Sequence, residues 1–117
     1  MSQYVNFYHY TTEHNADNII RTGVINETAD GGPDAKLGRG VYGTKINPQA
    51  GQKQIAKNNW TVGWQNRQRS GHVEYVFRIN MPRGKLEEKT FSPNRHVYVH
   101  RGPIQLNQYD WECLEVN

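Results

Sequence analysis

The feature that most restricts the fold is a change of periodicity within the first 23 residues. Residues 3–10, QYVNFYHY, alternate Tyr and Asn with Val, Phe and His, and this period of two in β-favouring residues predicts a strand. Over residues 11–23 the apolar positions take helical spacing, behind a Thr-Thr pair that can cap a helix and ahead of Gly23, which closes it. A strand that leads directly into a capped helix therefore opens the chain, with His9 at the junction.

The rest of the chain predicts more strands than helices. Strands are expected over residues 40–44, 72–82, 95–102 and 109–116, and a second helix from Pro48 to about Asn59. A chain of 117 residues has room for one hydrophobic core. We therefore predict a single α+β domain over residues 1–117, with mostly antiparallel strands and one or two short helices.

The cysteine count and the hydropathy restrict the setting of the protein. Cys113 is the single cysteine of the sequence, so the chain forms no internal disulfide and nothing in it demands an oxidising compartment. No apolar run approaches the roughly 20 residues of a membrane-spanning helix. His72 and His100 lack a metal-ligand spacing with any acid. We expect a cytoplasmic protein with no metal site and no membrane segment.

Positive charge is concentrated in the middle of the sequence. The net charge is +3, but residues 45–101 hold eleven Lys and Arg against three Glu, a local surplus of +8. Trp60, Trp64, Tyr75 and Phe77 are interleaved with these cations. Such a segment attracts a polyanion, either a nucleic acid or the diphosphate of a nucleotide. On charge alone, a solvated cationic surface is the better explanation.

Three segments in order carry a resemblance to a known family. The segments are YHYTT from residue 8, LGRGVYGT from residue 37 and RHVYVHRGPIQLNQYDWECLEV from residue 95. Together they resemble the ADP-ribosyltransferase fold of the diphtheria-toxin and poly(ADP-ribose) polymerase type, and the small toxin transferases with a His-Tyr-Asp signature. The resemblance runs from Phe7 to Val116 and implies an α+β fold with a split, mostly antiparallel sheet.

The resemblance assigns roles to individual residues of an NAD+ site. His9 matches the family histidine that holds a ribose hydroxyl, and Tyr42 matches the tyrosine whose ring packs against nicotinamide. Tyr10 stands where the family has a glycine that grips the carboxamide through its backbone, and Thr11 matches the neighbouring Ser or Thr. His96 falls at the position of the family's catalytic acid, where this chain has no carboxylate.

Further residues complete the expected site. The NAD+ diphosphate is expected to meet Lys36 and Arg39, and Gly40 and Thr44 lie on either side of the Tyr42 segment. Trp60 and Trp64 are candidates for a second wall for nicotinamide, although packing in a small core explains them better, and Glu74, Asp110 and Glu112 are candidates for a substitute acid. Taken singly, each of these residues is explained as well by packing or by surface charge, and only their combination indicates a dinucleotide site.

The resemblance implies a mono-ADP-ribosyltransferase that moves ADP-ribose from NAD+ to a macromolecular acceptor. The basic middle segment favours a nucleic acid over a protein as that acceptor. A toxin or effector of this kind acts in the cytoplasm, or is delivered into the cytoplasm of a target cell. A neutralising antitoxin or immunity protein is then an expected partner. Two alternatives stay open at this point: a catalytically silent module that binds NAD+ or ADP-ribose, and an RNA 2′-phosphotransferase.

Overall fold

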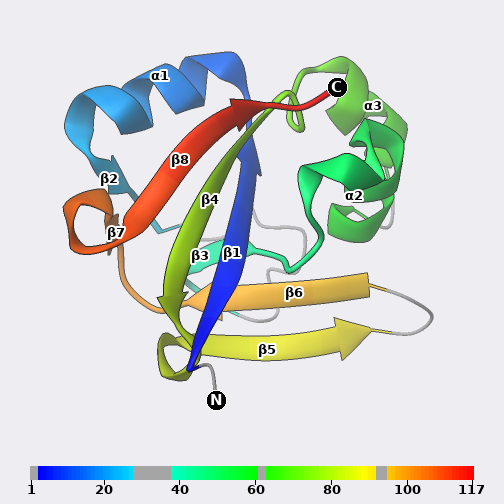
Figure 1. The fold of residues 1–117 in the computed structure, drawn as a ribbon. Helices are drawn as coiled ribbons and strands as arrows, with labels where there is room; N and C mark the ends of the chain where they lie inside the picture. The colour runs from blue at the N-terminus through cyan, green and yellow to red at the C-terminus, as the bar shows by residue number, and fades with distance from the viewer. Residues whose placement is uncertain (1–2, 28–37, 61–62, 92–94) are drawn as a thin grey trace.

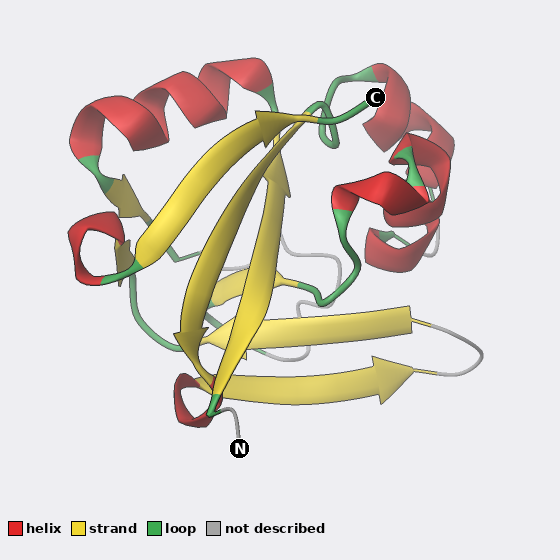
Figure 2. Cartoon of the chain, viewed as in Figure 1, coloured by secondary structure: helices red, strands yellow, loops and turns green. Residues whose placement is uncertain are grey.

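Two three-stranded antiparallel sheets form the body of the protein, in a computed structural model that describes residues 3–27, 38–60, 63–91 and 95–117. One sheet has the order β1-β4-β8 and the other has the order β3-β6-β5, while β2 and β7 form a separate pair (Figures 1 and 2). The strands are β1 Tyr4–Thr11, β2 Val24–Ile25, β3 Val41–Gly43, β4 Tyr75–Pro82, β5 Leu86–Phe91, β6 Arg95–His100, β7 Ile104–Gln105 and β8 Asp110–Glu115. The expected split, mostly antiparallel sheet is confirmed.

Helix α1, Glu13–Thr22, follows β1 directly, as the change of periodicity predicts. The Thr12 hydroxyl accepts the N–H of Asn15, which satisfies one of the free donors of the first turn. Gly23 ends the helix with φ at 75°, a left-handed conformation that glycine adopts without strain. The predicted strand–cap–helix unit is therefore confirmed at both of its ends.

The second predicted helix is divided. Pro48–Ala50 forms a 3-10 turn, and helix α2, Gln52–Asn59, begins after Gly51, whose φ is 88°. Helix α3, Trp64–Arg69, was not predicted, and the described residues therefore hold three α-helices where one or two were expected. None of the described helices is long and apolar enough to span a membrane.

The strand predictions need correction, and the short strands β2 and β7 were among those not predicted. Strand β5, which was not predicted, has the sequence LEEKTF, and its mostly exposed side chains follow from its place at the edge of its sheet. The strand expected from residue 72 begins instead at Tyr75, because His72–Glu74 form a turn after α3. This turn moves His72 off the sheet, which matters for the site below.

Strand β1 separates two hydrophobic clusters by the alternation of its side chains. Phe7 packs in the first cluster with Ile19 of α1, and Tyr10 packs in the second with Ile55 of α2. The backbone of Tyr8 exchanges hydrogen bonds of 2.9 and 3.0 Å with that of Thr44, which ties β1 to the end of β3. This tie between the two sheets brings His9 beside Tyr42.

Gly43 of β3 lies against the ring of Phe7 of β1, and we expect Gly43→Ala to destabilise the fold. A Cβ at this position would lie 2.5 Å from the ring of Phe7, which is fully buried and has no space to move. Overpacking of this kind costs about 1–3 kcal/mol. Chemical denaturation should show that loss for Gly43→Ala and almost none for Gly84→Ala, where nothing lies within 4 Å of the added carbon. Equal stabilities of the two variants would contradict the packing described here.

Candidate active site

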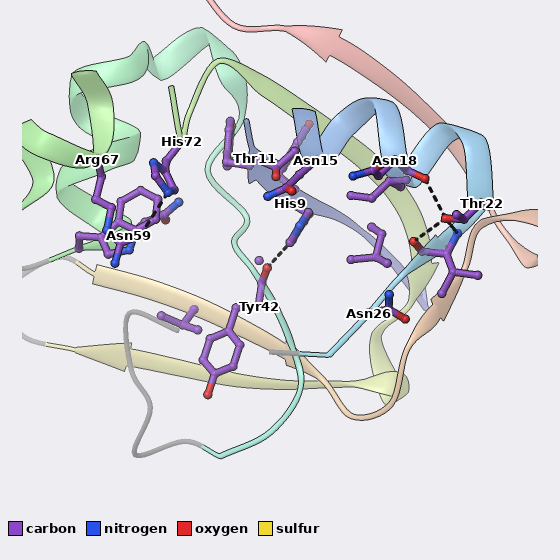
Figure 3. Close-up of a pocket in the computed structure, with 18 of the residues that line it drawn as sticks. His9, Thr11, Asn15, Asn18, Thr22, Asn26, Tyr42, Asn59, Arg67 and His72 are labelled. Carbon is purple, nitrogen blue, oxygen red and sulfur yellow. Dashed lines mark hydrogen bonds between the residues drawn. The ribbon is translucent and has the colours of Figure 1, made fainter. Parts of the chain in front are cut away.

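A cavity of about 640 Å³ opens between the two sheets. The His9 side chain and the Tyr42 segment lie at its centre (Figure 3). One end is polar and is lined by residues on and after α1, and the other end is formed by α2, α3 and the turn that follows them. The first end includes Asn15, Asn18, Arg21, Thr22 and Asn26, and the second includes Asn59, Trp60, Arg67 and His72.

His9 is held in one orientation by the backbone of β3. Its Nδ1–H donates to the carbonyl oxygen of Tyr42 at 2.8 Å (Figure 3). This bond assigns the hydrogen to Nδ1 and leaves Nε2 with a lone pair, so the ring can accept a hydrogen bond there. The residue is partly exposed at the cavity, yet the surrounding protein removes enough water to lower the pKa of His9 below its usual 6.5. A neutral acceptor therefore stands at the centre of the cavity.

Tyr42 is fixed through both its backbone and its hydroxyl. The residue pairs with Val99 in the β3–β6 ladder, and its hydroxyl donates to the carbonyl oxygen of Gly38 at 2.6 Å. The aromatic ring is consequently held in place before any ligand binds. The sequence prediction that His9 and Tyr42 share one crevice agrees with this geometry, since both line the same cavity.

Tyr10 and Thr11 also line the cavity, at the end of β1. The side chain of Tyr10 packs in the second hydrophobic cluster, and its hydroxyl donates to the carbonyl oxygen of Ile46 at 2.7 Å. Burial of that hydroxyl raises the pKa of Tyr10. A large side chain is therefore accommodated at a position where the family has glycine.

His96 does not reach the cavity, which corrects the expectation of a catalytic contact there. Its side chain is 4% exposed, and its Nε2–H donates to a Glu88 carboxylate oxygen at 2.8 Å. The Nδ1 atom accepts from the Thr44 hydroxyl at 3.1 Å and from the Lys45 N–H at 3.2 Å. The adjacent residue on β6, Val97, lines the cavity instead. Because side chains alternate along a strand, His96 points to the opposite face.

Asn58 completes the buried network and was missed by sequence reasoning. Its side-chain amide donates to the carbonyl oxygen of His96 at 2.9 Å and accepts the His96 N–H at 2.6 Å. Arg95 donates through Nε to the Asn58 carbonyl oxygen at 2.6 Å and through Nη2 to that of Asn59 at 3.1 Å. These bonds fix the end of α2 where Asn59 and Trp60 enter the cavity. A buried Asn at the end of a short helix gives no sequence signal of this role.

Three further predicted positions are not brought to the cavity. Arg39 pairs with Glu27 at 2.9 Å, Gly40 lies against Val99, and Thr44 belongs to the buried network. These three are absent from the described cavity lining. Lys36 lies outside the described residues.

The expected substitute acids are engaged elsewhere. Arg78 forms ion pairs with Glu112 at 2.8 Å and with Asp110 at 3.8 Å, while the Glu74 carboxylate lies against Gly71. No Asp or Glu occurs among the described residues that line the cavity. The described part of the chain also holds no group of three His, Cys, Asp or Glu that could bind a metal ion. The cavity therefore offers neutral acceptors, amides and two arginines.

The second end of the cavity combines an aromatic ring with a cation. The Arg67 guanidinium lies 5.4 Å from the centre of the Trp60 ring, and its Nη1 is 3.3 Å from Nε2 of His72. Trp60 thus lines the cavity, whereas Trp64, the other expected wall, lies outside it. Arg67 and His72 were not predicted, because an unpredicted helix and the turn after it carry them.

Acid is expected to destabilise the protein below pH 6.5, and His96 is one of the residues that contribute. Burial lowers the pKa of His96 below 6.5, so the unfolded chain binds the proton first as the pH falls and the free energy of unfolding decreases. For one such residue the decrease is at most about 1.4 kcal/mol per pH unit. Chemical denaturation between pH 8 and pH 5.5 should show a smaller dependence for His96→Gln than for wild type. The exposed His14 provides a matched control, and a slope that His96→Gln leaves unchanged would refute the assignment.

Comparison with known proteins gives one match. A family model described as HYD1 signature containing ADP-ribosyltransferase matches residues 7–90. The match includes His9, Tyr42, Trp60 and Arg67 and ends before His96. No curated protein and no solved structure matches the chain.

Proposed function

The chain belongs to the HYD1-signature family of toxin ADP-ribosyltransferases, and from this membership we propose that the cavity between β1 and β3 binds NAD+ and transfers its ADP-ribose to a macromolecule. Members of this family use NAD+ as their substrate. The observation that supports this location is the 2.8 Å hydrogen bond from the His9 ring to the Tyr42 backbone, which fixes the His9 side chain beside Tyr42 in the cavity.

The geometry of the cavity supports one arrangement of the dinucleotide. The Nε2 lone pair of His9 accepts a hydrogen bond from a ribose hydroxyl, and the backbone at Tyr10 and Thr11 holds the carboxamide. The Tyr42 ring packs against nicotinamide, with Trp60 as a second aromatic wall. Stacking on an aromatic side chain contributes about 1–3 kcal/mol, by analogy with base stacking. The dinucleotide therefore meets side chains that are already positioned before it binds.

The transfer breaks the bond between ribose C1′ and the nicotinamide nitrogen. The electron pair stays with nicotinamide, which leaves neutral, while positive charge develops on the ribose as it does in glycoside hydrolysis. A protonated imidazole beside that charge would oppose the reaction, so the lowered pKa of His9 favours it. An acceptor oxygen or nitrogen then bonds to C1′ and loses its proton to solvent. Since no carboxylate lines the described cavity, we propose transfer of a single ADP-ribose without chain elongation.

His96 enters this proposal as a positioning residue. Through Thr44 and Lys45 it holds the segment that follows Tyr42, and through Asn58 it is coupled to the end of α2. Both cavity walls therefore depend on the same buried network. The residue lies at the family's acid position by sequence, but it acts on the shape of the cavity and has no contact with the reacting ribose.

The acceptor is proposed to be a nucleic acid rather than a protein, because the basic surplus of residues 45–101 raises the local concentration of a polyanion. A toxin domain of this kind acts in the cytoplasm of the cell that it modifies. A neutralising antitoxin or immunity protein is the expected partner in the cell that produces it.

Incubation with NAD+ labelled in the adenosine half tests the function. Release of free nicotinamide together with label on a macromolecular fraction is expected, and both should be lost in His9→Ala. Retained NAD+ binding without nicotinamide release, with RNA, DNA and protein mixtures all supplied, would show a silent binding module and overturn the proposal.

A further inference from the structure

Helices α2 and α3 carry positively charged residues and contain no Asp or Glu. Residues 35–73 contain seven Lys and Arg and no Asp or Glu. Four of these cations lie on the two helices, which pack side by side at one edge of the molecule (Figure 1). They are Lys53, Lys57, Arg67 and Arg69.

A shallow groove on this helix pair has a tryptophan in its lining. The groove has a volume of about 450 Å³, and its lining includes Trp64, Lys53 and Arg69, with three glutamines between them. Lys57 Nζ lies 5.1 Å from the centre of the Trp64 ring. Lys53 and Arg69 are exposed. The groove therefore offers an aromatic ring, amide hydrogen-bonding groups and cations together, with no carboxylate among its described lining.

The same pairing of aromatic ring and cation recurs where the helices meet the cavity. Trp60 follows directly after α2, and Arg67 of α3 lies over its ring while also lining the cavity. Two tryptophans, each with a cation beside it, thus occur on one helix pair. Trp64 lines the groove, and Trp60 lines the cavity together with Arg67 and His72.

We propose that the α2–α3 face binds a single-stranded nucleic acid and leads it into the cavity beside Trp60. Proteins that bind single strands combine a positively charged path for the phosphates with aromatic rings on which the bases stack. A duplex keeps its bases stacked internally, so it cannot use tryptophan rings in this way. An acidic protein would contact the cations, but its carboxylates would not stack on the two tryptophan rings.

This inference rests on the proposed function only for its last step, the transfer of ADP-ribose to the bound strand. A nucleophilic oxygen or nitrogen of the bound strand forms the new bond to ribose C1′. The bond from C1′ to nicotinamide breaks with its electron pair on nicotinamide, and the acceptor's proton leaves to solvent. Binding of the strand itself needs no NAD+ and is tested separately.

Fluorescence anisotropy with a labelled single-stranded RNA and a single-stranded DNA of the same sequence, without NAD+, provides the test. Trp64→Ala is expected to weaken binding about tenfold or more. Lys53→Gln combined with Arg69→Gln should reduce the slope of log K against log salt by about 1.4, since each phosphate contact on a single strand contributes about 0.7. Trp64→Phe keeps an aromatic face and should retain most of the affinity, which separates stacking from a folding defect.

Lys85→Ala is the matched control, because Lys85 is exposed, belongs to the 3-10 turn between β4 and β5, and is not part of the groove lining. It should leave both the affinity and the salt dependence unchanged. The inference is overturned if the wild-type protein binds neither strand at low salt, or if the groove variants bind as wild type does. It is also overturned if label from NAD+ goes to proteins alone at a rate that the Lys53→Gln, Arg69→Gln variant does not alter. Strand binding without any nicotinamide release would instead support the nucleic-acid-binding surface and contradict the proposed transferase activity.

Discussion

His9→Ala is expected to reduce nicotinamide release from NAD+ by about 100-fold or more. The imidazole lies at the centre of the cavity, a backbone carbonyl fixes its orientation at 2.8 Å, and its second nitrogen is free of a proton and can accept a hydrogen bond. Loss of a group that positions the reacting sugar costs on this order. Nicotinamide release, followed by chromatography, measures the effect directly.

Two conservative variants separate the nitrogens of His9. An Asn at this position places its amide near the site of Nδ1 and can still donate to the Tyr42 carbonyl, but nothing remains where Nε2 was. A Gln places its amide near the site of Nε2 and can still accept from a ribose hydroxyl. We therefore expect His9→Gln to keep more activity than His9→Asn. The reverse order would mean that the bond to Tyr42, and not the lone pair at Nε2, is what the reaction needs.

The pH dependence of the wild-type activity follows from the same ring. Burial lowers the pKa of His9 below 6.5, so the neutral acceptor form persists on acidification past that value. The rate should be level above pH 6.5 and fall only below it. His14→Ala, which alters an exposed histidine outside the cavity lining, should reproduce the wild-type profile.

Tyr42→Ala is the second variant with a large expected effect, a loss of about 10- to 100-fold in kcat/KM for NAD+. The ring provides the aromatic face proposed for nicotinamide, and stacking of this kind contributes about 1–3 kcal/mol. Tyr42→Phe removes only the hydroxyl that donates to Gly38 at 2.6 Å and should lose much less activity. Steady-state kinetics of nicotinamide release measures both variants.

Thermal unfolding serves as the control for Tyr42, because the residue also pairs in the β3–β6 ladder. The Ala variant should unfold cooperatively at a temperature close to that of the Phe variant. Equal activity of the two variants would show that the ring does not contact the substrate, and the placement of nicotinamide would then be wrong.

Local physics made the first 23 residues predictable. Periodicity is a property of neighbouring residues, and it changes from two to helical spacing at a pair of threonines. The resulting strand, the Thr12 cap and the Gly23 end all occur as expected. The sequence equally placed His9 at the junction and Tyr42 beside glycines, the two residues that now share a cavity.

The position of the His96 side chain could not be predicted from the sequence. A motif assigns a residue to a position in the chain, but the face of the strand on which its side chain lies depends on register and on the sheet that covers it. On β6 that register turns Val97 toward the cavity and His96 toward Glu88. Arg39 and Thr44 also lie outside the cavity lining. Arg39 forms an ion pair with Glu27, and Thr44 forms a hydrogen bond with His96.

By itself the sequence determined the strand–helix opening and the excess of positive charge, because both depend on residue type and on near neighbours. The roles of His9 and Tyr42 were inferred from the resemblance to a family. Only the tertiary structure decided that Asn58 is coupled to the cavity walls, that Arg67 lies over Trp60 and that no described acid reaches the site. Those contacts join segments far apart in the chain. Their geometry is set by how the sheets and helices pack, which no short stretch of residues encodes.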